Sequence, residues 1–517
     1  MFKVNELSNL SIYGMLEKTV QKYPNHLAVI DGAIELNYTQ LKEKVDAFSS
    51  VLYRSGFQKG DRVGLMLPNG IHYMIAYYSV QRLGGIVVQV NPLYQTSELE
   101  YMLEDADPKW FICGRNQEDK VNKIRRFENV QVIFTRDVFG LDQIMLEGKN
   151  NELPPLNIDP KEDVAVLQYT GGTTGKSKGV MLTHFNILCN IHQSGEVVSS
   201  VMNKGEERIL GISPLTHAMA MTNMNSAILL AATYIILEKF NATDLLQLIH
   251  KYRPTFMVGS PTMYIALLNH PDLEQFDLSC FKICISGSAP LPVEVLKELE
   301  RKTGAQIFEG YGLSEGTTST HRTPLGGKRK IGSVGIPVPG TESKIVDLET
   351  GLEEVPIGEN GELIVKGPQV MKGYWKKPEE TVLTVRDGWL YTGDIAYRDE
   401  DGFYYIAGRK KDMIIAGGLN IYPAEVEEVL YQHPKVAEAC AFGVPDPYLG
   451  EKLLAIVILK KGESLSDQEL LSWCEGRIAR YKIPRAVEFR DALPKTIVGK
   501  ILRRQLVEEY KHKLGAL

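Results

Sequence analysis

Hydrophobic and polar residues follow two distinct periods along the first 400 positions of the chain. Apolar residues at helical spacing predict amphipathic helices over 14–24 (GMLEKTVQKYP) and 39–56 (TQLKEKVDAFSSVLYRSG). Short apolar runs at 62–67 (RVGLML) and 86–90 (IVVQV) predict buried strands. Because strands alternate with helices, this region predicts stacked α/β layers with parallel sheet, in which ligands bind where loops leave the strand ends.

Later segments extend this pattern and then change it. Three further strands are predicted, and each runs into a turn rich in glycine or proline: 255–260 (TFMVGS), 281–292 (FKICISGSAPLP) and 304–316 (GAQIFEGYGLSEG). From about residue 332 the alternation has period two with turn glycines, which predicts a β-rich subdomain. A compact α/β unit ends the chain, with helices predicted at 423–433, around 466–478 and at 501–514, and strands at 436–444, 453–459 and 486–489.

The fold class predicted from these segments is α/β. A large N-terminal domain, residues 1–410, combines stacked α/β layers with the β-rich subdomain, and a small, mobile α/β domain occupies residues 411–517. Chain length supports this division, since 517 residues exceed what one hydrophobic core usually organises. The longest apolar run, 226–237 (SAILLAATYIIL), is shorter than the roughly 20 residues of a membrane-spanning helix, so we expect a buried helix and strand there.

Composition narrows the classes of function. The net charge of −6 and the isoelectric point near 6.0 argue against a nucleic-acid-binding protein, which usually carries a basic face. The cysteines are scattered, and the close pair Cys280 and Cys284 lacks the second cluster that a zinc site needs. The N-terminus has no apolar secretory core. We therefore expect a cytoplasmic protein with reduced thiols and no stable membrane insertion, and leave transient membrane contact and the oligomeric state open.

A segment rich in glycine and threonine, 169–179 (YTGGTTGKSKG), separates two predicted strands. It is not a Walker A loop, because that motif needs a glycine at position 170, where this chain has threonine, and a helix directly afterwards. A glycine loop between two strands is a hairpin-like flap. Backbone N–H groups freed by glycine, threonine hydroxyls and lysine charges all suit phosphate oxygens. The loop alone fits a phosphate site or an ordinary surface hairpin.

Four more segments follow the loop: 310–317 (GYGLSEGT), 387–394 (DGWLYTGD), 408–423 (GRKKDMIIAGGLNIYP) and 494–500 (PKTIVGK). Together with the loop they resemble the signature motifs of the adenylate-forming superfamily, which includes acyl-CoA synthetases, luciferases and peptide-synthetase adenylation domains. The chain looks most like a bacterial fatty acid–CoA ligase, and the resemblance runs from about residue 10 to the C-terminus. It implies that ATP converts a carboxylate into an acyl-AMP with release of pyrophosphate, and that a thiol then displaces AMP.

The resemblance implies three catalytic side chains. Lys500 would be the cation between the substrate carboxylate and the α-phosphate, two anions that repel each other, and it lies at the start of the last predicted helix, where the helix dipole also favours an anion. Glu315 would hold Mg²⁺ on the phosphates, with Thr174 as a second metal contact. His217, in SPLTHAMAM, would stand at the entrance of the acyl pocket. Without the motifs, a lone histidine or a helix-start lysine is more often structural.

The same resemblance implies the residues that contact ATP and CoA. Tyr311 would stack on adenine, Asp394 would accept hydrogen bonds from both ribose hydroxyls, and Arg409 would reach ribose or phosphate. Lys411 takes the position of the hinge on which the small domain swivels, and Gly418 would line the tunnel for the pantetheine arm of CoA. The other implied contacts lie in the phosphate loop, the adenine floor and the segment after Tyr311, and are Thr170, Gly171, Gly172, Thr173, Thr174, Gly175, Lys178, Gly287, Ser288, Ala289, Gly312 and Ser314.

Three functions remain open at this point. The first is a ligase that joins a medium- or long-chain fatty acid to CoA, the second is an aryl-acid–CoA ligase or an adenylation enzyme serving a carrier protein, and the third is a non-catalytic relative that binds nucleotide. An amino-acid activator needs a buried carboxylate for the substrate ammonium, and residues 212–237 contain no Asp or Glu. We also expect no fused carrier domain, because the chain ends soon after Lys500.

Two observations favour the fatty acid. Gly171 replaces the serine that most of the superfamily has, and this variant is typical of fatty acyl-CoA ligases. Residues 218–221 (AMAM) are small or flexible and apolar, which suits a tunnel for an alkyl chain as well as a packed core. Since Glu315, Asp394, Arg409 and Lys500 are all present, a non-catalytic relative is disfavoured. We predict an ATP-dependent fatty acid–CoA ligase that uses ATP, Mg²⁺ and CoA.

Overall fold

The computed structural model describes residues 4–135, 153–170, 177–289, 291–496 and 499–515. The two predicted N-terminal helices form where apolar residues recur at helical spacing. α2 (Ile12–Lys22) begins at Ser11, whose side chain accepts a hydrogen bond from Gly14 N, and α3 (Tyr38–Arg54) begins at Asn37 in a capping box with Gln40. Both helices bury their apolar face in the largest hydrophobic core.

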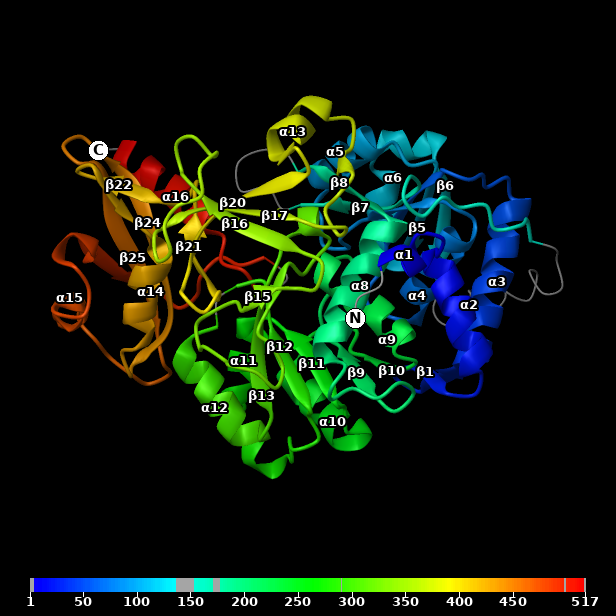
Figure 1. Cartoon of the computed structure of the whole chain (residues 1–517), viewed down its shortest axis with the longest axis horizontal. Coiled ribbons are helices and arrows are strands. Elements are labelled where there is room, and N and C mark those ends of the chain that lie inside the picture. The colour runs from blue at the N-terminus through cyan, green and yellow to red at the C-terminus, as the bar shows by residue number, and fades with distance from the viewer. Residues whose placement is uncertain (1–3, 136–152, 171–176, 290, 497–498, 516–517) are drawn as a thin grey trace.

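Two large sheets organise the N-terminal part of the chain (Figure 1). The nine-stranded sheet, in the order β15-β14-β13-β12-β11-β9-β10-β1-β2, is parallel from β13 to β1. Its strands are β1 (Leu27–Asp31), β2 (Ile34–Asn37), β9 (Arg208–Gly211), β10 (Thr233–Ile236), β11 (Phe256–Gly259), β12 (Ile283–Ser286), β13 (Gln306–Tyr311), β14 (His321–Arg322) and β15 (Ile336–Pro337). Parallel pairing agrees with the sequence-based prediction.

The second, seven-stranded sheet has the order β18-β8-β7-β4-β3-β5-β6 and is parallel from β7 to β6, whereas the pairs β7–β8 and β8–β18 are antiparallel. Its strands are β3 (Arg62–Met66), β4 (Ile86–Gln89), β5 (Trp110–Gly114), β6 (Gln131–Thr135), β7 (Val164–Tyr169), β8 (Gly179–Thr183) and β18 (Gly373–Tyr374). The antiparallel β7–β8 hairpin carries the predicted phosphate loop at its tip.

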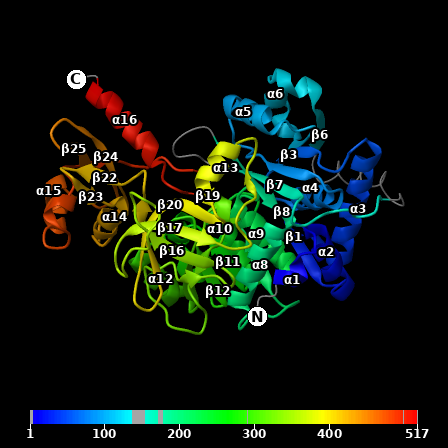
Figure 2. The ribbon, with the colours of Figure 1, turned by 45° about the horizontal axis from the view of Figure 1, so that its top comes forward.

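Helices separate and cover the two sheets, as the stacked-layer prediction requires (Figures 1 and 2). Side chains of both sheets meet in one core with α2, α3, α4 (Ile71–Arg82), α8 (His184–Val198) and α9 (Ala218–Leu229). On the outer face of the nine-stranded sheet pack α10 (Ala242–Tyr252), α11 (Pro261–Leu268) and α12 (Val293–Thr303), and on the outer face of the other pack α5 (Thr96–Ala106) and α6 (Glu118–Asn122). The run 226–237 forms the end of α9 and β10, as expected.

A third, antiparallel sheet corresponds to the predicted β-rich subdomain. It consists of β16 (Glu342–Val346), β17 (Gly361–Lys366), β19 (Val385–Arg386), β20 (Trp389–Arg398) and β21 (Tyr404–Arg409), and it has a hydrophobic core of its own. The short helices α1 (Val4–Leu7) and α13 (Pro378–Thr384) lie outside these sheets. The strand pair β20–β21 matters for the site because it sets Asp394 opposite Arg409 in register.

The C-terminal unit is a smaller α/β body with its own sheet, at the left of Figure 1. Its elements are β22 (Ile414–Ala416), β23 (Leu419–Ile421), α14 (Pro423–Tyr431), β24 (Val436–Asp446), β25 (Gly450–Leu459), α15 (Asp467–Cys474), β26 (Ala486–Phe489) and α16 (Arg503–Gly515). The chain leaves the third sheet at Arg409 and joins this one at Ile414. The predicted division after residue 410 falls in this link, and the division and the mobility of the smaller unit stay predictions.

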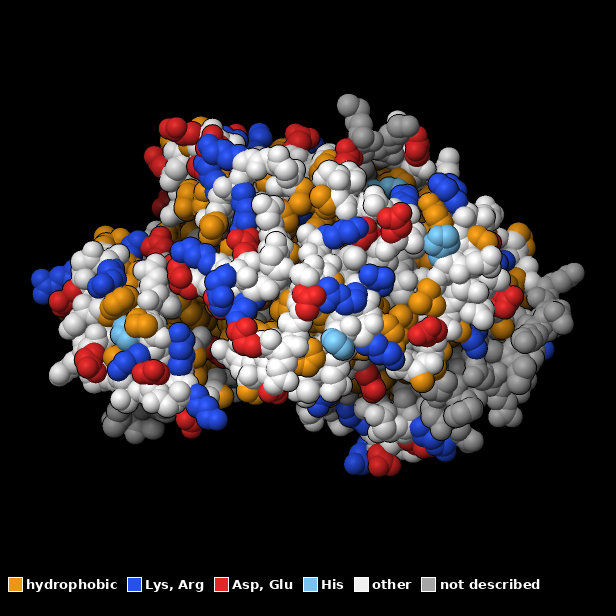
Figure 3. All heavy atoms as spheres, turned by 90° about the horizontal axis from the view of Figure 1, so that it is seen from below, with side chains coloured by type: hydrophobic (Ala, Val, Ile, Leu, Met, Phe, Trp, Pro, Cys, Tyr) orange, Lys and Arg blue, Asp and Glu red, His pale blue; other side chains and the backbone are white. Residues whose placement is uncertain are grey.

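The surface carries charges of both signs. On the face drawn in Figure 3, lysine and arginine side chains are interspersed with aspartate and glutamate, which fits the small net charge of −6. Within the part of the chain that the structure describes, no helix has both the length and the apolar character needed to cross a bilayer.

Candidate active site

The predicted adenine-binding residues gather at the carboxyl ends of β12 and β13, where a parallel sheet usually binds its ligand. Gly287 directly follows β12, and its N–H donates to Gly259 O at the end of β11 (3.1 Å). Ser288 has a φ of 72°, and its neighbour Ala289 is exposed beside it. A Cβ placed on Gly287 would lie 3.4 Å from Met219 Sδ, so this floor borders the start of α9.

The segment after β13 turns tightly. A Cβ on Gly312 would lie 1.3 Å from Thr318 O, a distance at which no side chain fits without moving the backbone. Within this turn, residues 314–316 form a short 3₁₀ helix that carries Ser314 and Glu315 next to the end of the sheet. The residues predicted to contact the α-phosphate and the metal therefore lie just beyond the carboxyl end of β13.

Three predicted nucleotide ligands form one hydrogen-bonded group. Tyr311 Oη donates to Asp394 Oδ2 (2.5 Å), and Arg409 Nε lies 3.0 Å from Asp394 Oδ1. Burial raises the pKa of the Asp394 carboxyl, and the Arg409 charge opposes that rise; Asp394 in turn raises the pKa of Arg409. Each oxygen of Asp394 is thus already oriented by a donor, which leaves a rigid acceptor for hydroxyl groups of a ligand.

A turn of the C-terminal unit brings Lys500 to this group. Thr496 N donates to Lys500 O (2.7 Å), and Lys500 N donates to Thr496 Oγ1 (3.1 Å). Burial lowers the pKa of the Lys500 ammonium, with Arg409 as a further repelling charge and Asp394 as an attracting one. The last helix begins at Arg503, two residues later than the predicted start at 501, so the turn rather than the helix end positions Lys500. This corrects the prediction that Lys500 lies at the helix start.

The same turn rests on the N-terminal part of the chain. Gly499 has a φ of 80°, and a Cβ on it would lie 1.9 Å from Thr262 Oγ1, in the first turn of α11. Thr262 Oγ1 also shares a hydrogen bond with Ser260 Oγ (2.9 Å). Contact this close requires glycine at 499 and fixes how near Lys500 comes to Asp394. Sequence reasoning missed Thr262, because nothing in its local sequence shows that the turn lies against it.

His217 is the N-cap of α9, and its Nδ1 accepts a hydrogen bond from Met219 N (3.3 Å). Burial and, to a smaller extent, the Lys500 charge together lower the pKa of its imidazole to about 4. His217 is therefore neutral at pH 7 with its proton on Nε2, and can donate a hydrogen bond. Because the Lys500 charge acts on His217, the two predicted catalytic residues lie near each other in this structure.

Glu315 is held by a residue that sequence reasoning missed. Tyr374 Oη, on β18, donates to Glu315 Oε1 (2.8 Å), and Lys178 Nζ lies 4.7 Å from the centre of the Tyr374 ring. Lys178 also pairs with Glu380. Tyr374 thus connects the predicted metal ligand to the base of the phosphate loop. The only local sequence that could have pointed to Tyr374 is the triplet Gly-Tyr-Trp at 373–375, and this triplet is not a recognised motif for a metal or phosphate site.

The phosphate loop has the predicted hairpin base. Thr170 N donates to Lys178 O (3.1 Å), and Ser177 Oγ donates back to Thr170 O, which closes the neck of the loop. Five predicted ligands in the loop lie outside the described residues: Gly171, Gly172, Thr173, Thr174 and Gly175. Within the described ranges, no three or more His, Cys, Asp or Glu side chains form a metal cluster. Of the two predicted metal contacts, Glu315 lies within the described residues, and its carboxylate is a hard oxygen ligand that suits a Mg²⁺ ion bound mainly by substrate phosphates.

Two predicted residues lie away from this group. Lys411 is exposed in the link between β21 and β22. Gly418, with a φ of 79°, forms the exposed tip of the β22–β23 hairpin, and a Cβ there would meet no described atom within 4 Å. In this arrangement of the two units, the predicted tunnel residue is not at the site.

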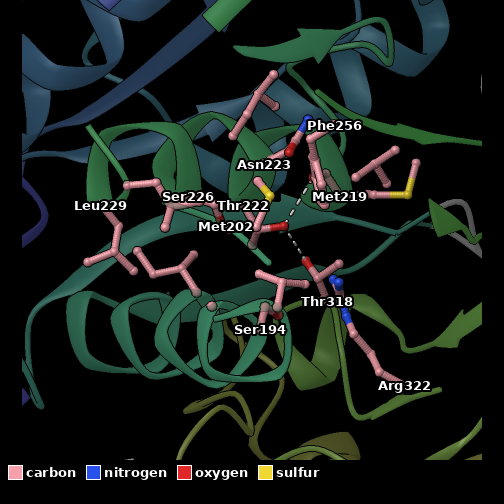
Figure 4. Close-up of a pocket in the computed structure, with 16 residues that line it drawn as sticks. Ser194, Met202, Met219, Thr222, Asn223, Ser226, Leu229, Phe256, Thr318 and Arg322 are labelled. Atoms are coloured by element: carbon pink, nitrogen blue, oxygen red, sulfur yellow. Dashed lines mark hydrogen bonds between the residues drawn. The ribbon is translucent and has the colours of Figure 1, made fainter. Parts of the chain in front are cut away.

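A narrow cavity opens beside the adenine floor and runs between α8 and α9 (Figure 4). Met219 and Thr318 lie at one end, next to Gly287 and Gly312, and Leu229 lies at the other end. Phe256 and Val258 of β11 contribute apolar wall from the sheet. The cavity thus runs from the predicted reaction centre into the helical layer between the two large sheets, next to residues 218–221, whose sequence suited an acyl tunnel as well as a packed core.

Two family models match most of the chain. Residues 16–375 match the family described as AMP-binding enzyme, and residues 425–500 match the AMP-binding enzyme C-terminal domain. This chain belongs to the AMP-binding enzyme family. The gap between the two matched regions, residues 376–424, contains the link from β21 to β22.

Relatives of this AMP-binding enzyme cover its full length. A long-chain-fatty-acid–CoA ligase from Bacillus subtilis is 45% identical, over 97% of this chain and 95% of that protein. The crystal structure of the anthranilate CoA ligase AuaEII in complex with anthranoyl-AMP is similar with a TM-score of 0.92 at 28% identity, covering 100% of both chains. The O-succinylbenzoate CoA synthetase MenE from Bacillus subtilis, in complex with ATP and magnesium ion, is similar with a TM-score of 0.82 at 29% identity, over 95% of this chain and 98% of that one.

Proposed function

We propose that this AMP-binding enzyme is an ATP-dependent fatty acid–CoA ligase. In the first step the fatty acid and ATP form acyl-AMP and pyrophosphate, and in the second CoA displaces AMP to give the thioester. The observation that carries the proposal is the position of Lys500, a desolvated ammonium near Asp394, Arg409 and His217, next to the end of a largely apolar cavity at Met219. ATP, Mg²⁺ and CoA are the co-substrates and metal implied by the relatives.

The residues divide the first step between them. The Lys500 charge offsets the repulsion between the carboxylate and the α-phosphate as the new bond forms, and its desolvation strengthens that interaction. The neutral His217 donates from Nε2 to the substrate carboxylate and so orients it. Tyr311 stacks on adenine, and Asp394 accepts the ribose hydroxyls. Glu315 would hold Mg²⁺, which neutralises phosphate charge when bound.

The cavity supports an aliphatic acid. From Met219 to Leu229, α9 advances about 15 Å, at about 1.5 Å per residue. An extended alkyl chain gains roughly 1.25 Å per carbon from its bond geometry, so the cavity wall spans about 12 carbons. The name of the Bacillus subtilis relative supports the same class of acid. An aryl acid is the second candidate, which the likeness to the anthranilate CoA ligase favours.

We also propose that residues 1–410 and 411–517 are two domains that change their relative orientation between the two steps. Lys411 is the hinge, and in the second orientation Gly418 lines the pantetheine tunnel. Support comes from the change of sheet between Arg409 and Ile414 and from the exposure of Gly418 at a hairpin tip. The cytoplasmic location stays a prediction from the sequence.

Release of AMP and pyrophosphate from ATP, measured with a panel of acids with and without CoA, tests the proposal. The panel includes octanoate, dodecanoate, hexadecanoate, benzoate, anthranilate and several amino acids. We expect AMP release that depends on CoA and peaks on an aliphatic acid of about 12 carbons or more. A peak on an aryl acid would move the enzyme to the second candidate, and an adenylate that CoA does not discharge would indicate a carrier-protein partner.

Lys500→Ala separates the two steps. Because the Lys500 charge acts on the first step, we expect pyrophosphate release to fall by at least 100-fold, while thioester formation from preformed acyl-AMP and CoA changes little. Lys435→Ala is the matched control, since Lys435 belongs to the same C-terminal unit and interacts with Ser464 O and Glu463. Equal loss of both half-reactions in Lys500→Ala would contradict the proposed role.

A further inference from the structure

The wall of the cavity is not wholly apolar. Polar side chains reach it from α8, from α9 and from the segment after Tyr311: Ser194, Thr222, Asn223, Ser226, Thr318 and Arg322. Three of them already contact other polar groups, since Thr222 Oγ1 lies 3.0 Å from Met219 O and 3.3 Å from Thr318 Oγ1, and Asn223 Nδ2 donates to Leu210 O (3.2 Å). Arg322 differs from the others because it brings a full charge to the helical layer between the two large sheets.

The backbone of β14 fixes the position of Arg322. Arg322 pairs with Gly310 across β13 and β14, and a Cβ on Gly310 would lie 3.6 Å from Arg322 Cγ and 4.0 Å from its Nε. The absence of a side chain at 310 therefore leaves room for the arginine to lie along the sheet. In Figure 4 its guanidinium ends beside Thr318, at the same end of the cavity as Met219 and opposite Leu229.

The guanidinium of Arg322 has few partners. Its Nε donates to Ser319 Oγ (2.9 Å), and across the described residues no other hydrogen bond and no ion pair of this side chain is found. Burial lowers the pKa of the guanidinium to about 10, and no carboxylate offsets this effect. A guanidinium has five N–H donors, so the four on its two terminal nitrogens are left for a ligand or for water in the cavity.

An unsubstituted alkyl chain cannot meet this requirement. A methylene group accepts no hydrogen bond, so a saturated chain that fills the cavity displaces water from the half-buried guanidinium of Arg322 and gives its terminal nitrogens no acceptor in return, which is costly. An oxygen on the chain would accept one or more of these donors in a charge-assisted hydrogen bond. Its place on the chain would be near the carboxyl group, because Arg322 lies at the end of the cavity beside Met219 and Ser288.

We propose that Arg322 binds an oxygen substituent near the carboxyl end of the acyl chain, so that the enzyme prefers oxygenated fatty acids to unsubstituted acids of equal length. The substituent is a hydroxyl, a keto group or a second carboxylate, which share the acceptor oxygen that the guanidinium recognises. The inference rests on the proposed fatty acid–CoA ligase activity and narrows its substrate class. Arg322 is a specificity-determining residue in this proposal and takes no part in bond formation.

The test compares kcat/KM for dodecanoate, 3-hydroxydodecanoate, 3-oxododecanoate, dodecanedioate and 12-hydroxydodecanoate in the wild type and in two variants. We expect the wild type to favour the 3-hydroxy or 3-oxo acid over dodecanoate by at least 10-fold, and to gain nothing from oxygen at carbon 12. Arg322→Met fills similar space without donors, so it should lose this preference and use dodecanoate at least as well as the wild type does. Arg322→Lys keeps the charge and should retain part of the preference.

AMP binding and AMP release provide two controls for this test. AMP binding, measured by calorimetry, should be the same in Arg322→Met and the wild type, which excludes a general loss of folding. A wild type that uses dodecanoate as well as the 3-substituted acids, or an Arg322→Met variant that keeps the wild-type preference, would overturn the inference while leaving the ligase activity in place. Absence of AMP release with every acid would instead contradict the proposed function itself.

Discussion

The hydroxyl of Tyr374 illustrates how much one atom can contribute to this site. It donates to Glu315 Oε1 at 2.8 Å, and Glu315 is the proposed carboxylate ligand of Mg²⁺. Loss of a group that orients a metal ligand typically lowers metal affinity by about 10- to 100-fold. Tyr374 therefore has a function that can be measured separately from its ring, which packs beside Lys178.

Tyr374→Phe removes the hydroxyl and keeps the ring. We expect the Mg²⁺ concentration for half-maximal pyrophosphate release to rise about 10-fold, because the Glu315 carboxylate loses one of its fixed orientations. Saturating Mg²⁺ should restore most of the rate. Tyr391→Phe is the control, since its hydroxyl donates to Gly351 O at 2.9 Å. An unchanged Mg²⁺ requirement in Tyr374→Phe would remove Tyr374 from the account of the site.

Residues named from motifs and residues found in the structure differ in a physical way. Asp394, Arg409 and Lys500 could be predicted because their sequence neighbourhoods resemble a known family. Tyr374 and Arg322 could not, because each acts through a tertiary contact that local sequence does not encode. Tyr374 lies 59 residues from the carboxylate it holds, and Arg322 matters because β14 folds it into the interior.

Among the elements, the turn before α16 connects the C-terminal unit to the chemistry. It is held by Thr496 and lies on the first turn of α11 through Gly499. Periodicity predicted most helices well, as for α2 and α3, since their apolar faces are continuous. It failed at the start of α16 because Ile501 extends the apolar pattern, whereas in the fold Ile501 forms an isolated bridge with Lys495.

Gly499→Ala tests the docking of this turn. A methyl group there would lie 1.9 Å from Thr262 Oγ1, so the turn must withdraw and take Lys500 with it. We expect acyl-AMP formation to fall at least 100-fold, with a much smaller effect on thioester formation from preformed acyl-AMP. Gly462→Ala is the matched control, because Gly462 has a similar φ of 84° and open space around it.

A second substitution distinguishes the clash from backbone strain in Gly499→Ala. Thr262→Gly removes the atoms that the new methyl group would meet, so the double variant should recover part of the lost adenylation rate. No recovery would mean that the strained φ, and not the contact with α11, causes the loss.

For the molecule as a whole, buried neutral histidines couple stability to pH. Burial lowers the imidazole pKa to about 4 in His184, His192 and His217, and to about 3 in His321. The unfolded chain binds these protons near pH 6.5 and the folded chain does not, so stability falls as the pH falls from 6.5 towards 4. Glu309, whose pKa burial raises to about 7, and Asp394, raised in the same direction, act oppositely but are outnumbered.

Urea unfolding at pH 7.0, 6.0 and 5.0 tests this coupling. Each such histidine contributes a slope of about 1.4 kcal/mol per pH unit within its window. His184→Asn, which keeps an acceptor for Ile12 N, should flatten the slope by about that amount. The exposed His26→Asn should leave it unchanged. A free energy of unfolding that is constant from pH 7 to 5 would show that these side chains take up protons in the folded state.

The contact between Gly312 and Thr318 O has a consequence for how this sequence can diverge. At 1.3 Å, even the smallest side chain at position 312 overlaps the carbonyl oxygen of Thr318. A single substitution of Gly312 by alanine or serine is therefore incompatible with the present path of this loop. Another residue at position 312 therefore requires that an insertion or other substitutions first change the path of the loop. Substrate range, by contrast, can change one residue at a time at cavity positions such as 226, a serine on α9 whose side chain lines the cavity.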